Sequence, residues 1–292
     1  MKIIVTGASG LVGSALCPAL EAAGHSVVRL SRNGPVSWHP TARTIDSAAL
    51  DGIHGVIHLA GESVAGRWTA AKKERILTSR RDGTRFLAET LAALPQPPEV
   101  LVSASAIGFY GDRHDELLTE QSPAGTGFLA AVAQEWEAAT NPAAAAGIRV
   151  VTIRTGIVLA RNGGALPALL PPFRLGLGGP IGSGRQWWSW LSLPDLVAIY
   201  EGALTDASLS GPVNAVAPGA VTNREFTRTL GNVLGRPARL PLPAPAVKLL
   251  LGEMGAEMLL ASAHVQPTAL TTTGFTFRFP ELGDALRAAL RP

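Results

Sequence analysis

A glycine-rich heptapeptide at residues 7–13, GASGLVG, carries the residue types that bind a dinucleotide phosphate. The first glycine permits a tight turn after an apolar strand, Gly10 lets the backbone approach a pyrophosphate, and Gly13 lets the next helix pack closely on a sheet. The helix N-terminus then offers free N–H groups to the anion. An ordinary tight turn is the alternative, but a strand before and a helix after favour phosphate binding. We expect cofactor contacts from Gly7, Ser9, Gly10, Leu11, Val12 and Gly13.

The end of the second apolar strand indicates which dinucleotide binds. Proteins that bind NAD place an acid there for the ribose 2′-hydroxyl. This chain has Arg29, Leu30, Ser31 and Arg32, and no acid follows until Asp46. A guanidinium and a hydroxyl suit a 2′-phosphate, so the sequence predicts NADP(H) held by Ser31 and Arg32. A solvated surface arginine is the alternative, and it is more credible for Arg29 than for Arg32.

Apolar strands and helices alternate through the first half of the chain, which indicates a parallel sheet covered on both faces. Strands are expected at 2–6, 26–30, 55–59, 100–103 and 148–153, with helices at 11–23, 70–94 and 127–146. The expected fold is therefore α/β, a Rossmann-type doubly wound parallel sheet with a smaller C-terminal substrate lobe. We expect an NADP-binding domain at 1–160, with returning segments around 185–220, and a substrate or lid lobe at 161–292 that includes a C-terminal segment at 240–292.

Composition excludes several classes of protein. Of the 292 residues, 47% are hydrophobic and 16% are charged, which is typical of a folded globular chain and excludes disorder. A net charge of +3 without basic runs argues against nucleic-acid binding. One cysteine excludes a disulfide framework and a zinc knuckle, and no apolar run reaches the roughly 18 residues of a membrane span. No signal peptide is expected before the first strand. We expect a soluble, cytoplasmic protein without a metal site, in which the loop acids Asp112, Asp115 and Glu116 are simply hydrated.

Several motifs resemble those of the extended short-chain dehydrogenase/reductase superfamily: HLAGE at 58–62, Ser79-Arg80, SASAIGFYG at 103–111 and RTGIVL at 154–159. The stretch 172–190 and the segment from about residue 240 are more specifically similar to its atypical, epimerase-like branch named after human short-chain dehydrogenase family 39U member 1. This resemblance implies a Rossmann domain that binds NADP(H). The further cofactor residues that it implies are His58, Leu59, Ala60, Gly61, Glu62, Arg80, Ser103, Ala104 and Arg154. The implied substrate or lid residues are Phe173, Gly182, Gln186, Trp188 and Trp190.

The chain departs from this superfamily in its catalytic pair, a Tyr-x-x-x-Lys in which the lysine lowers the tyrosine pKa. The two tyrosines, Tyr110 and Tyr200, are followed four positions later by His114 and Leu204, so the pair is absent. Ser105 still matches the superfamily serine, and Tyr110 is the candidate replacement acid, with packing over the nicotinamide as the alternative. Relatives carry a histidine where this chain has Ser192. For His58 we favour a place in the cofactor shell or core over a catalytic role.

Three functions remain open from the sequence. The first is an NADP(H)-dependent oxidoreductase acting on a small carbonyl or hydroxyl compound, with proton transfer by Ser105, Tyr110 or water. The second is a protein that binds NADPH as a sensor and does no chemistry, which the missing pair favours. The third is a nucleotide-sugar epimerase or dehydratase, which would need the missing tyrosine. The substrate is a small molecule of unknown identity, and the chain is a monomer or a homodimer.

Overall fold

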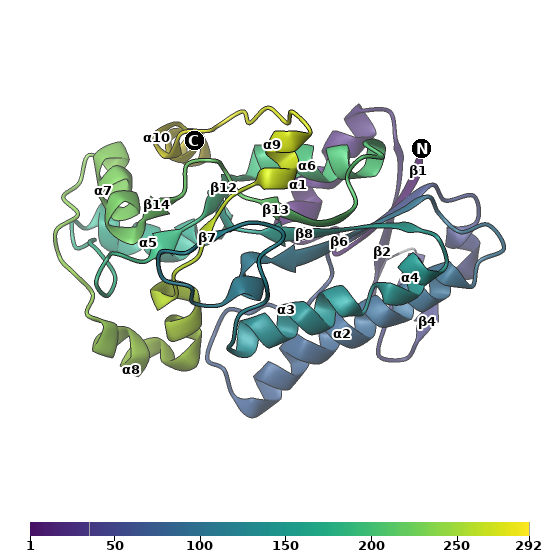
Figure 1. Ribbon diagram of the computed structural model, residues 1–292, viewed down its shortest axis with the longest axis horizontal. Coiled ribbons are helices and arrows are strands. Elements are labelled where there is room, and N and C mark those ends of the chain that lie inside the picture. Colours follow the sequence, from purple (N-terminus) through teal and green to yellow (C-terminus); the bar gives the residue numbers. More distant parts are fainter. Residues whose placement is uncertain (35, 292) are drawn as a thin grey trace.

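The computed structural model describes residues 1–34 and 36–291, so Pro292, the last residue of the expected lobe, lies outside the described residues. Its centre is an eight-stranded sheet in the order β13-β8-β6-β5-β1-β2-β3-β4, in which only the β3–β4 pair is antiparallel (Figure 1). The strands are β1 (Lys2–Thr6), β2 (Ser26–Ser31), β3 (Val36–His39), β4 (Thr44–Ile45), β5 (Gly55–His58), β6 (Val100–Ala106), β8 (Arg149–Thr155) and β13 (Gly211–Ala215). The strand order switches between β1 and β5: β2, β3 and β4 lie on one side of β1, and β5, β6, β8 and β13 lie on the other. This is the expected doubly wound Rossmann-type arrangement, and the predicted fold class is confirmed.

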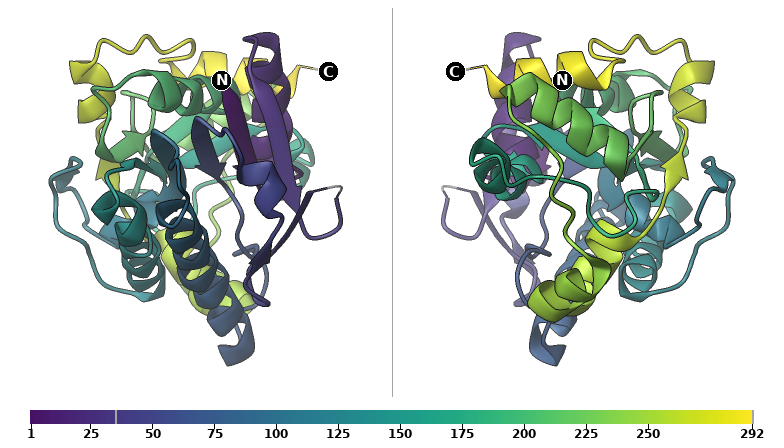
Figure 2. Two further views of the ribbon diagram at one scale, coloured as in Figure 1. Left: turned by 90° about the vertical axis from the view of Figure 1, so that its right-hand side faces the viewer. Right: turned by 90° about the vertical axis from the view of Figure 1, so that its left-hand side faces the viewer.

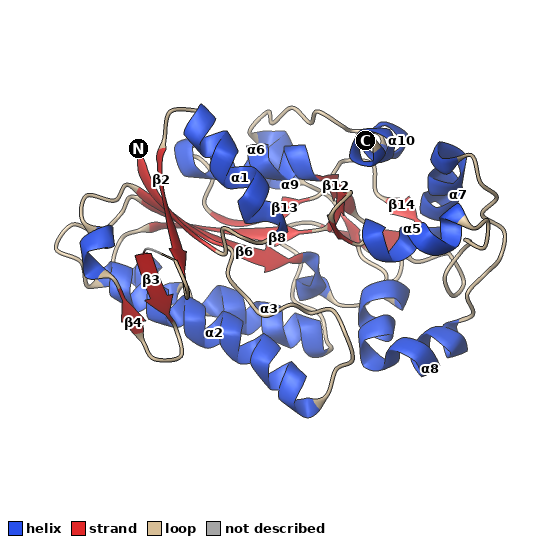
Figure 3. Ribbon diagram, turned by 180° about the vertical axis from the view of Figure 1, so that it is seen from behind, coloured by secondary structure: helices blue, strands red, loops and turns tan. Residues whose placement is uncertain are grey.

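Helices cover both faces of this sheet, as the apolar strands require. One face carries α1 (Leu11–Ala22) and α6 (Leu193–Thr205); the other carries α2 (Ala70–Ala92), α3 (Phe128–Ala138) and α4 (Asn141–Ala145) (Figure 3). Neighbouring strand residues point to opposite faces, so Ile3 packs in one hydrophobic cluster with Leu16 of α1, and Ile4 packs in another with Leu87 of α2. Because β13, β8, β6, β5, β1, β2 and β3 are parallel, their carboxyl ends lie at one edge of the sheet.

The remaining elements lie outside the main sheet (Figure 2). They are η1 (Ser47–Leu50), η2 (Ile107–Tyr110), β7 (Leu117–Leu118), β9 (Ile157–Ala160), β10 (Gly163–Gly164), α5 (Leu166–Arg174), β11 (Trp187–Trp188), β12 (Trp190–Ser192), β14 (Val221–Thr222), α7 (Asn223–Leu234), α8 (Ala244–Gly255), η3 (Ala256–Leu260), β15 (His264–Val265), α9 (Thr268–Thr272) and α10 (Leu282–Leu290). Within the segment 185–220, α6 and β13 lie with the main sheet. The larger hydrophobic cluster also continues from Ile3 into α10, through Leu286.

The sequence predicts neither a membrane-spanning helix nor a metal site. Among residues 1–34 and 36–291, no helix combines the length and the apolarity needed to cross a membrane. Within these ranges there is also no group of three or more His, Cys, Asp or Glu side chains arranged to hold a metal ion.

Candidate functional site

The glycine loop joins β1 to α1 in a tight turn with no room for a side chain at Gly7 or Gly13. Gly7 has a φ of +70°, and its carbonyl oxygen accepts a hydrogen bond from the Gly10 N–H at 3.0 Å. A Cβ on Gly13 would lie 2.4 Å from the Gly7 oxygen and 2.6 Å from the Ala8 Cα. Gly10 is the N-cap of α1, and no side chain caps that end. The first-turn N–H groups of Leu11, Val12 and Gly13 therefore have no intrahelical partner and can bind an anion.

Cationic side chains surround Glu62, which follows the carboxyl end of β5. Lys72 of α2 binds its carboxylate with Nζ–Oε1 at 2.7 Å, and the Arg75 Nε lies 3.8 Å from the same oxygen. The hydrogen bond from Lys72 lowers the pKa of Glu62, and the charges of Arg75 and Arg32 lower it further. Arg32 is exposed, just past the end of β2. Three cations thus influence Glu62, and one of them, Arg32, is a residue that the sequence predicts to hold the 2′-phosphate.

Arg29, on β2, pairs at the protein surface, which is the alternative interpretation given for it from the sequence. Its guanidinium pairs with Glu21 of α1 at 2.7 Å, and both side chains are nearly half exposed. Ser31, the last residue of β2, is half-buried. Arg29 is therefore a surface residue, and Arg32 is the arginine left available at this edge.

His58 ties three elements together from inside the core. Its Nδ1 lies 2.7 Å from Thr6 Oγ1 of β1, and its Nε2 lies 3.0 Å from Thr84 Oγ1 of α2. The Thr6 hydroxyl also accepts the backbone N–H groups of Leu59 and Ala60, so it fixes the turn after β5. Complete burial, with a smaller contribution from the charge of Arg80, lowers the pKa of His58 to about 4. The ring is neutral and enclosed, as expected of a core residue.

This buried histidine predicts a pH dependence of stability. The unfolded chain takes up a proton near the ordinary pKa of 6.5, but the folded chain does so only near 4, so folding is favoured above pH 6.5 and stability falls as the pH drops toward 4. We expect the free energy of unfolding, measured with urea, to be roughly 2 kcal/mol lower at pH 5 than at pH 7.5 because of this group. His58→Gln should remove most of that difference and the exposed control His39→Gln should retain it. An unchanged difference in His58→Gln would contradict the assignment.

Arg80 of α2 hydrogen-bonds to the turn at residues 60–62. One guanidinium nitrogen donates to the carbonyl oxygens of Glu62 at 2.9 Å and Ile76 at 3.2 Å, and the group lies 4.8 Å from the centre of the Trp136 ring. Desolvation lowers the Arg80 pKa to about 10. A Cβ on Gly61 would lie 3.3 Å from the Arg80 Cζ. Arg80 thus positions the backbone of this turn.

Ser105 and Arg154, from adjacent strands, share one largely buried carboxylate. The Ser105 hydroxyl donates to Glu137 Oε1 of α3 at 2.6 Å, while the Arg154 guanidinium donates to both oxygens of Glu137, at 2.9 and 2.8 Å. Ser105 and Arg154 are each only 4% exposed. The sequence predicts that Arg154 binds the cofactor and that Ser105 takes part in proton transfer, but the structure directs both side chains into the protein. Glu137 is the partner that sequence reasoning did not single out.

Tyr110 belongs to the same internal network. Its hydroxyl lies 2.7 Å from Asn214 Oδ1 and 3.0 Å from the Thr119 carbonyl oxygen, and it accepts a hydrogen bond from Arg154 at 3.0 Å. The side chain is 0% exposed, and burial raises its pKa. A phenol that is enclosed and more weakly acidic than usual cannot reach a substrate. This geometry argues against the expected role of Tyr110 as the acid and favours packing.

The remaining expected cofactor residues lie at the same edge. Ser103 is buried and Ala104 is half-buried near the end of β6, which pairs with β5 through His58 and Ser103. Gly61 and Ser9 are exposed, and Leu59 and Ala60 are half-buried. The structure therefore brings the glycine loop, the end of β2, the turn after β5 and the end of β6 to one edge of the sheet.

A second missed residue, Glu257, caps α3 from the C-terminal segment. Its carboxylate oxygens accept the backbone N–H groups of Phe128 and Leu129, both at 2.8 Å. The N-cap residue of α3 is Gly127, which has no side chain to do this. Lys73 of α2 joins the contact, with Nζ 2.7 Å from Glu253 and 4.5 Å from the centre of the Phe128 ring. A helix that starts after glycine was the only sequence signal that an outside acceptor was needed.

The expected substrate and lid residues separate into two groups. Gly182 and Gln186 line a cavity of about 370 Å³ with Asp112, Ser183 and Lys248, and Ala244, Ala256 and Leu260 add apolar surface to it. The Gln186 amide nitrogen donates to the carbonyl oxygens of Ile181 and Leu259, which fixes that side chain. Phe173, Trp188 and Trp190, by contrast, are buried in the hydrophobic core. Both tryptophans therefore pack in the core.

Comparisons with known proteins agree along the whole chain. The model of the "NAD dependent epimerase/dehydratase family" matches residues 3–215, and a "domain of unknown function" matches residues 242–289. Epimerase family protein Mb2239 of Mycobacterium bovis is 42% identical over 99% of this chain and 98% of its own. The human epimerase family protein SDR39U1 is 38% identical over 98% of this chain and 99% of its own.

Solved structures show the same likeness. A crystal structure of human SDR39U1 (isoform 2) with NADPH superposes with a TM-score of 0.89 at 37% identity, covering 99% of this chain and 98% of that one. A structure described as the nucleoside-diphosphate sugar epimerase from Corynebacterium glutamicum has a TM-score of 0.83 at 40% identity, covering 99% of this chain and 58% of that one. The resemblance seen in the sequence motifs is confirmed.

Proposed function

This chain belongs to the NAD dependent epimerase/dehydratase family, and on that premise we propose that it binds NADP(H) along the carboxyl edge of β1, β2, β5 and β6. The observation that carries the proposal is the glycine loop. Its helix end has no side-chain cap, and Gly13 admits no Cβ, so backbone N–H groups can approach a pyrophosphate. These residues fit a dinucleotide. The NADPH in the human relative's structure supports the same choice of cofactor.

The cations around Glu62 support the phosphorylated dinucleotide over NAD. In this proposal Arg32 and Ser31 hold the 2′-phosphate, while Lys72 and Arg75 add positive charge nearby. Glu62 keeps Lys72 in place. An acid in the ribose position of NAD-binding proteins would repel this phosphate, and β2 here ends in Ser31 without one.

We expect Arg32→Ala to weaken NADPH binding at least tenfold, or about 1.4 kcal/mol, and to leave NADH binding unchanged. The loss comes from removing a charge-assisted contact with the 2′-phosphate. Titration of the purified protein, followed by nicotinamide fluorescence, measures both affinities. Arg29→Ala is the matched control, since Arg29 pairs with Glu21 instead. Equal affinity of the wild type and Arg32→Ala for NADPH would remove Arg32 from the site, and no binding of either nucleotide would end the proposal itself.

For the reaction, we favour an oxidoreductase acting on a small polar carbonyl or hydroxyl compound. NADPH, when bound, supplies a hydride to a carbonyl carbon. The cavity at Gly182 and Gln186 is the proposed substrate site, where Ser183, Lys248 and the fixed Gln186 amide would orient oxygen atoms. Because Ser105 and Tyr110 are turned into the core, a water molecule in this cavity is the proposed proton carrier.

One observation favours the second candidate function, an NADPH sensor without turnover. Ser105 and Tyr110, the two groups available for superfamily-type proton transfer, are both buried and hydrogen-bonded. Mixing NADPH-loaded protein with a panel of small carbonyl compounds and following the absorbance of NADPH separates the two functions. Oxidation that saturates with one compound supports the enzyme. Tight binding without any oxidation supports the sensor, and a copurified nucleotide sugar would favour the epimerase instead.

A further inference from the structure

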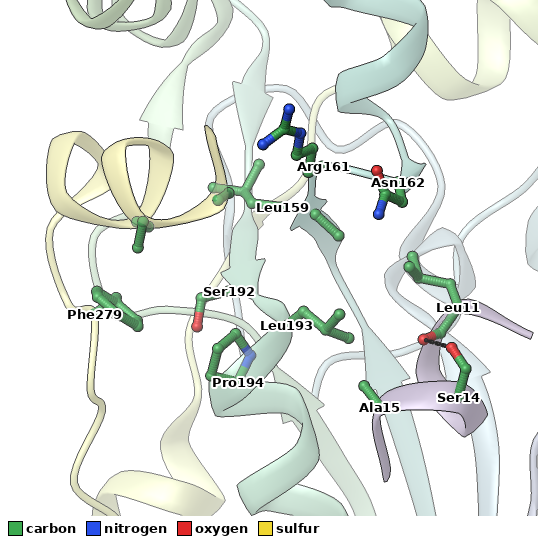
Figure 4. A pocket seen from close by; sticks show the side chains of 14 residues that line it. Leu11, Ser14, Ala15, Leu159, Arg161, Asn162, Ser192, Leu193, Pro194 and Phe279 are labelled. Atoms are coloured by element: carbon green, nitrogen blue, oxygen red, sulfur yellow. Dashed lines mark hydrogen bonds between the residues drawn. The ribbon is translucent and has the colours of Figure 1, made fainter. Parts of the chain in front are cut away.

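A second cavity of about 370 Å³ lies between α1, β9, the start of α6 and α10 (Figure 4). It is separate from the cavity at Gly182, with which it shares no lining residue. Leu11 and Ser14 of α1 line one side, and Phe279 lies opposite them, before α10. A volume of this order falls within the range of small-molecule sites, roughly 300–1,000 Å³.

The cavity exists because small side chains face it. Ala285, Ala288 and Ala289 of α10 and Ala15 of α1 are among its walls, where larger apolar residues would have filled the space. The wall around Phe279 is held firmly, because the buried Asp195 carboxylate accepts the backbone N–H groups of Arg278 at 2.6 Å and Phe279 at 3.2 Å. These hydrogen bonds fix the backbone of the wall that carries Phe279.

The charged and amide side chains of the cavity are gathered at one end. Arg161 and Asn162 form the tip of the β9–β10 hairpin and lie side by side there in Figure 4. One guanidinium nitrogen of Arg161 donates to the Arg291 carbonyl oxygen at 2.9 Å, which holds the side chain but leaves its other N–H donors. The described residues that line the cavity include one cation and no carboxylate. This end therefore suits an anion.

The hydroxyls in the cavity are already engaged. Ser14 Oγ donates to the Leu11 carbonyl oxygen, and Ser192 Oγ donates to Asp195 Oδ2. Leu159 and Leu193 offer only apolar surface. The cavity thus has one end with a cation and an amide, and the rest of its lining is mainly apolar, with its two hydroxyls already hydrogen-bonded. This is the complement of an amphipathic carboxylate.

We infer that this cavity is a binding site for a medium-chain monocarboxylate, with its carboxylate at Arg161 and Asn162 and its alkyl chain between α1 and α10. An alkyl chain gains free energy by leaving water, and the guanidinium selects the charged head group. The inference does not rest on the proposed cofactor or substrate. The cavity shares only Leu11 with the glycine loop, which would use the Leu11 backbone N–H, and it shares no residue with the cavity at Gln186.

Sodium octanoate and octan-1-ol, which share the same chain length, are the probes that test this site on the full-length protein. We expect octanoate to bind saturably in calorimetry and to raise the melting temperature, since a ligand that binds only the folded state stabilises it. Arg161→Gln should raise the Kd for octanoate about fivefold or more and leave octan-1-ol unaffected. Arg287→Gln, a charge change on an exposed residue of α10 that does not line the cavity, is the matched control and should change neither.

A cavity-filling variant locates the binding. Ala288→Phe should abolish binding of octanoate, because its ring occupies the space beside α10. If octanoate does not bind, if octan-1-ol binds as tightly as octanoate, or if Arg161→Gln has no effect, the inference is overturned. Unchanged binding by a folded Ala288→Phe protein would place the ligand elsewhere and overturn it too. Arg161 is exposed, so its variant tests the proposal even if Ala288→Phe does not fold.

Discussion

Adding a single methyl group at Gly13 is expected to reduce NADPH affinity by more than about a hundredfold, or roughly 2.7 kcal/mol. In Gly13→Ala the new Cβ would stand 2.4 Å from the Gly7 oxygen and 2.6 Å from the Ala8 Cα. All the atoms it meets belong to the backbone, so the loop itself must move. Displacing the loop misaligns the N–H groups at the start of α1 with the pyrophosphate. Fluorescence titration with NADPH and with NADH measures the effect, which should be equal for the two nucleotides because both carry that group.

Gly202 provides the matched control for this substitution. It also lies inside a helix, α6, and a Cβ there would meet nothing within 4 Å. Gly202→Ala should therefore retain full affinity and be slightly more stable, because alanine favours helix by up to about 1 kcal/mol. If Gly13→Ala stays folded and binds NADPH within twofold of the wild type, the glycine loop is not the phosphate site.

Removing the guanidinium of Arg154 should lower the free energy of unfolding by about 3–5 kcal/mol, the largest loss expected among the variants proposed for this protein. Arg154→Met leaves the Glu137 carboxylate buried without its two hydrogen bonds from arginine, and it also removes the donor to Tyr110. The side chains of this ion pair are only 5% and 15% exposed, so water cannot replace the lost partner. Urea unfolding at pH 7.5 gives the free energy. The double variant Arg154→Met/Glu137→Leu should recover a large part of the loss, because no charge then remains buried.

An exposed ion pair shows what the same change costs at the surface. Arg287 pairs with Asp284 at 2.7 Å on α10, and both side chains are more than half exposed. Arg287→Met is expected to cost less than about 1 kcal/mol. A loss in Arg154→Met as small as this would mean that Glu137 is protonated or hydrated in the folded protein, which would contradict the buried pair.

The phosphate loop was predictable because its determinants are contiguous in the chain. An apolar strand, three glycines at fixed spacing and a helix start are all local features, and each restricts the backbone wherever the rest of the chain goes. The same holds for the alternation of strands and helices, from which the parallel sheet and the edge carrying residues 58–62 follow. The boundaries of β1 agree with the expected range 2–6, and α1 ends one residue before the expected 23.

The catalytic expectations depended on a different kind of information. Ser105 and Tyr110 match superfamily positions in type, but their availability depends on burial and on distant partners. Glu137 lies 32 residues from Ser105, and Asn214 lies 104 residues from Tyr110. Nothing near Ser105 or Tyr110 in the sequence indicates that these groups meet. The tryptophans at 188 and 190 entered the core for the same reason, since their surroundings come from other elements.

The sequence by itself thus determined the fold class and the phosphate loop, because steric limits on glycine and the periodicity of apolar residues act within a few neighbours. It also showed that the Tyr-x-x-x-Lys pair is absent, since this needs only the positions of the tyrosines and lysines. Folding alone decided which polar groups stay reachable. It enclosed Tyr110 and Arg154, brought Glu257 to α3 across 129 residues, and left two cavities lined by distant segments. Exposure and pairing are properties of the packed molecule, since they arise only when segments far apart in the chain exclude water together.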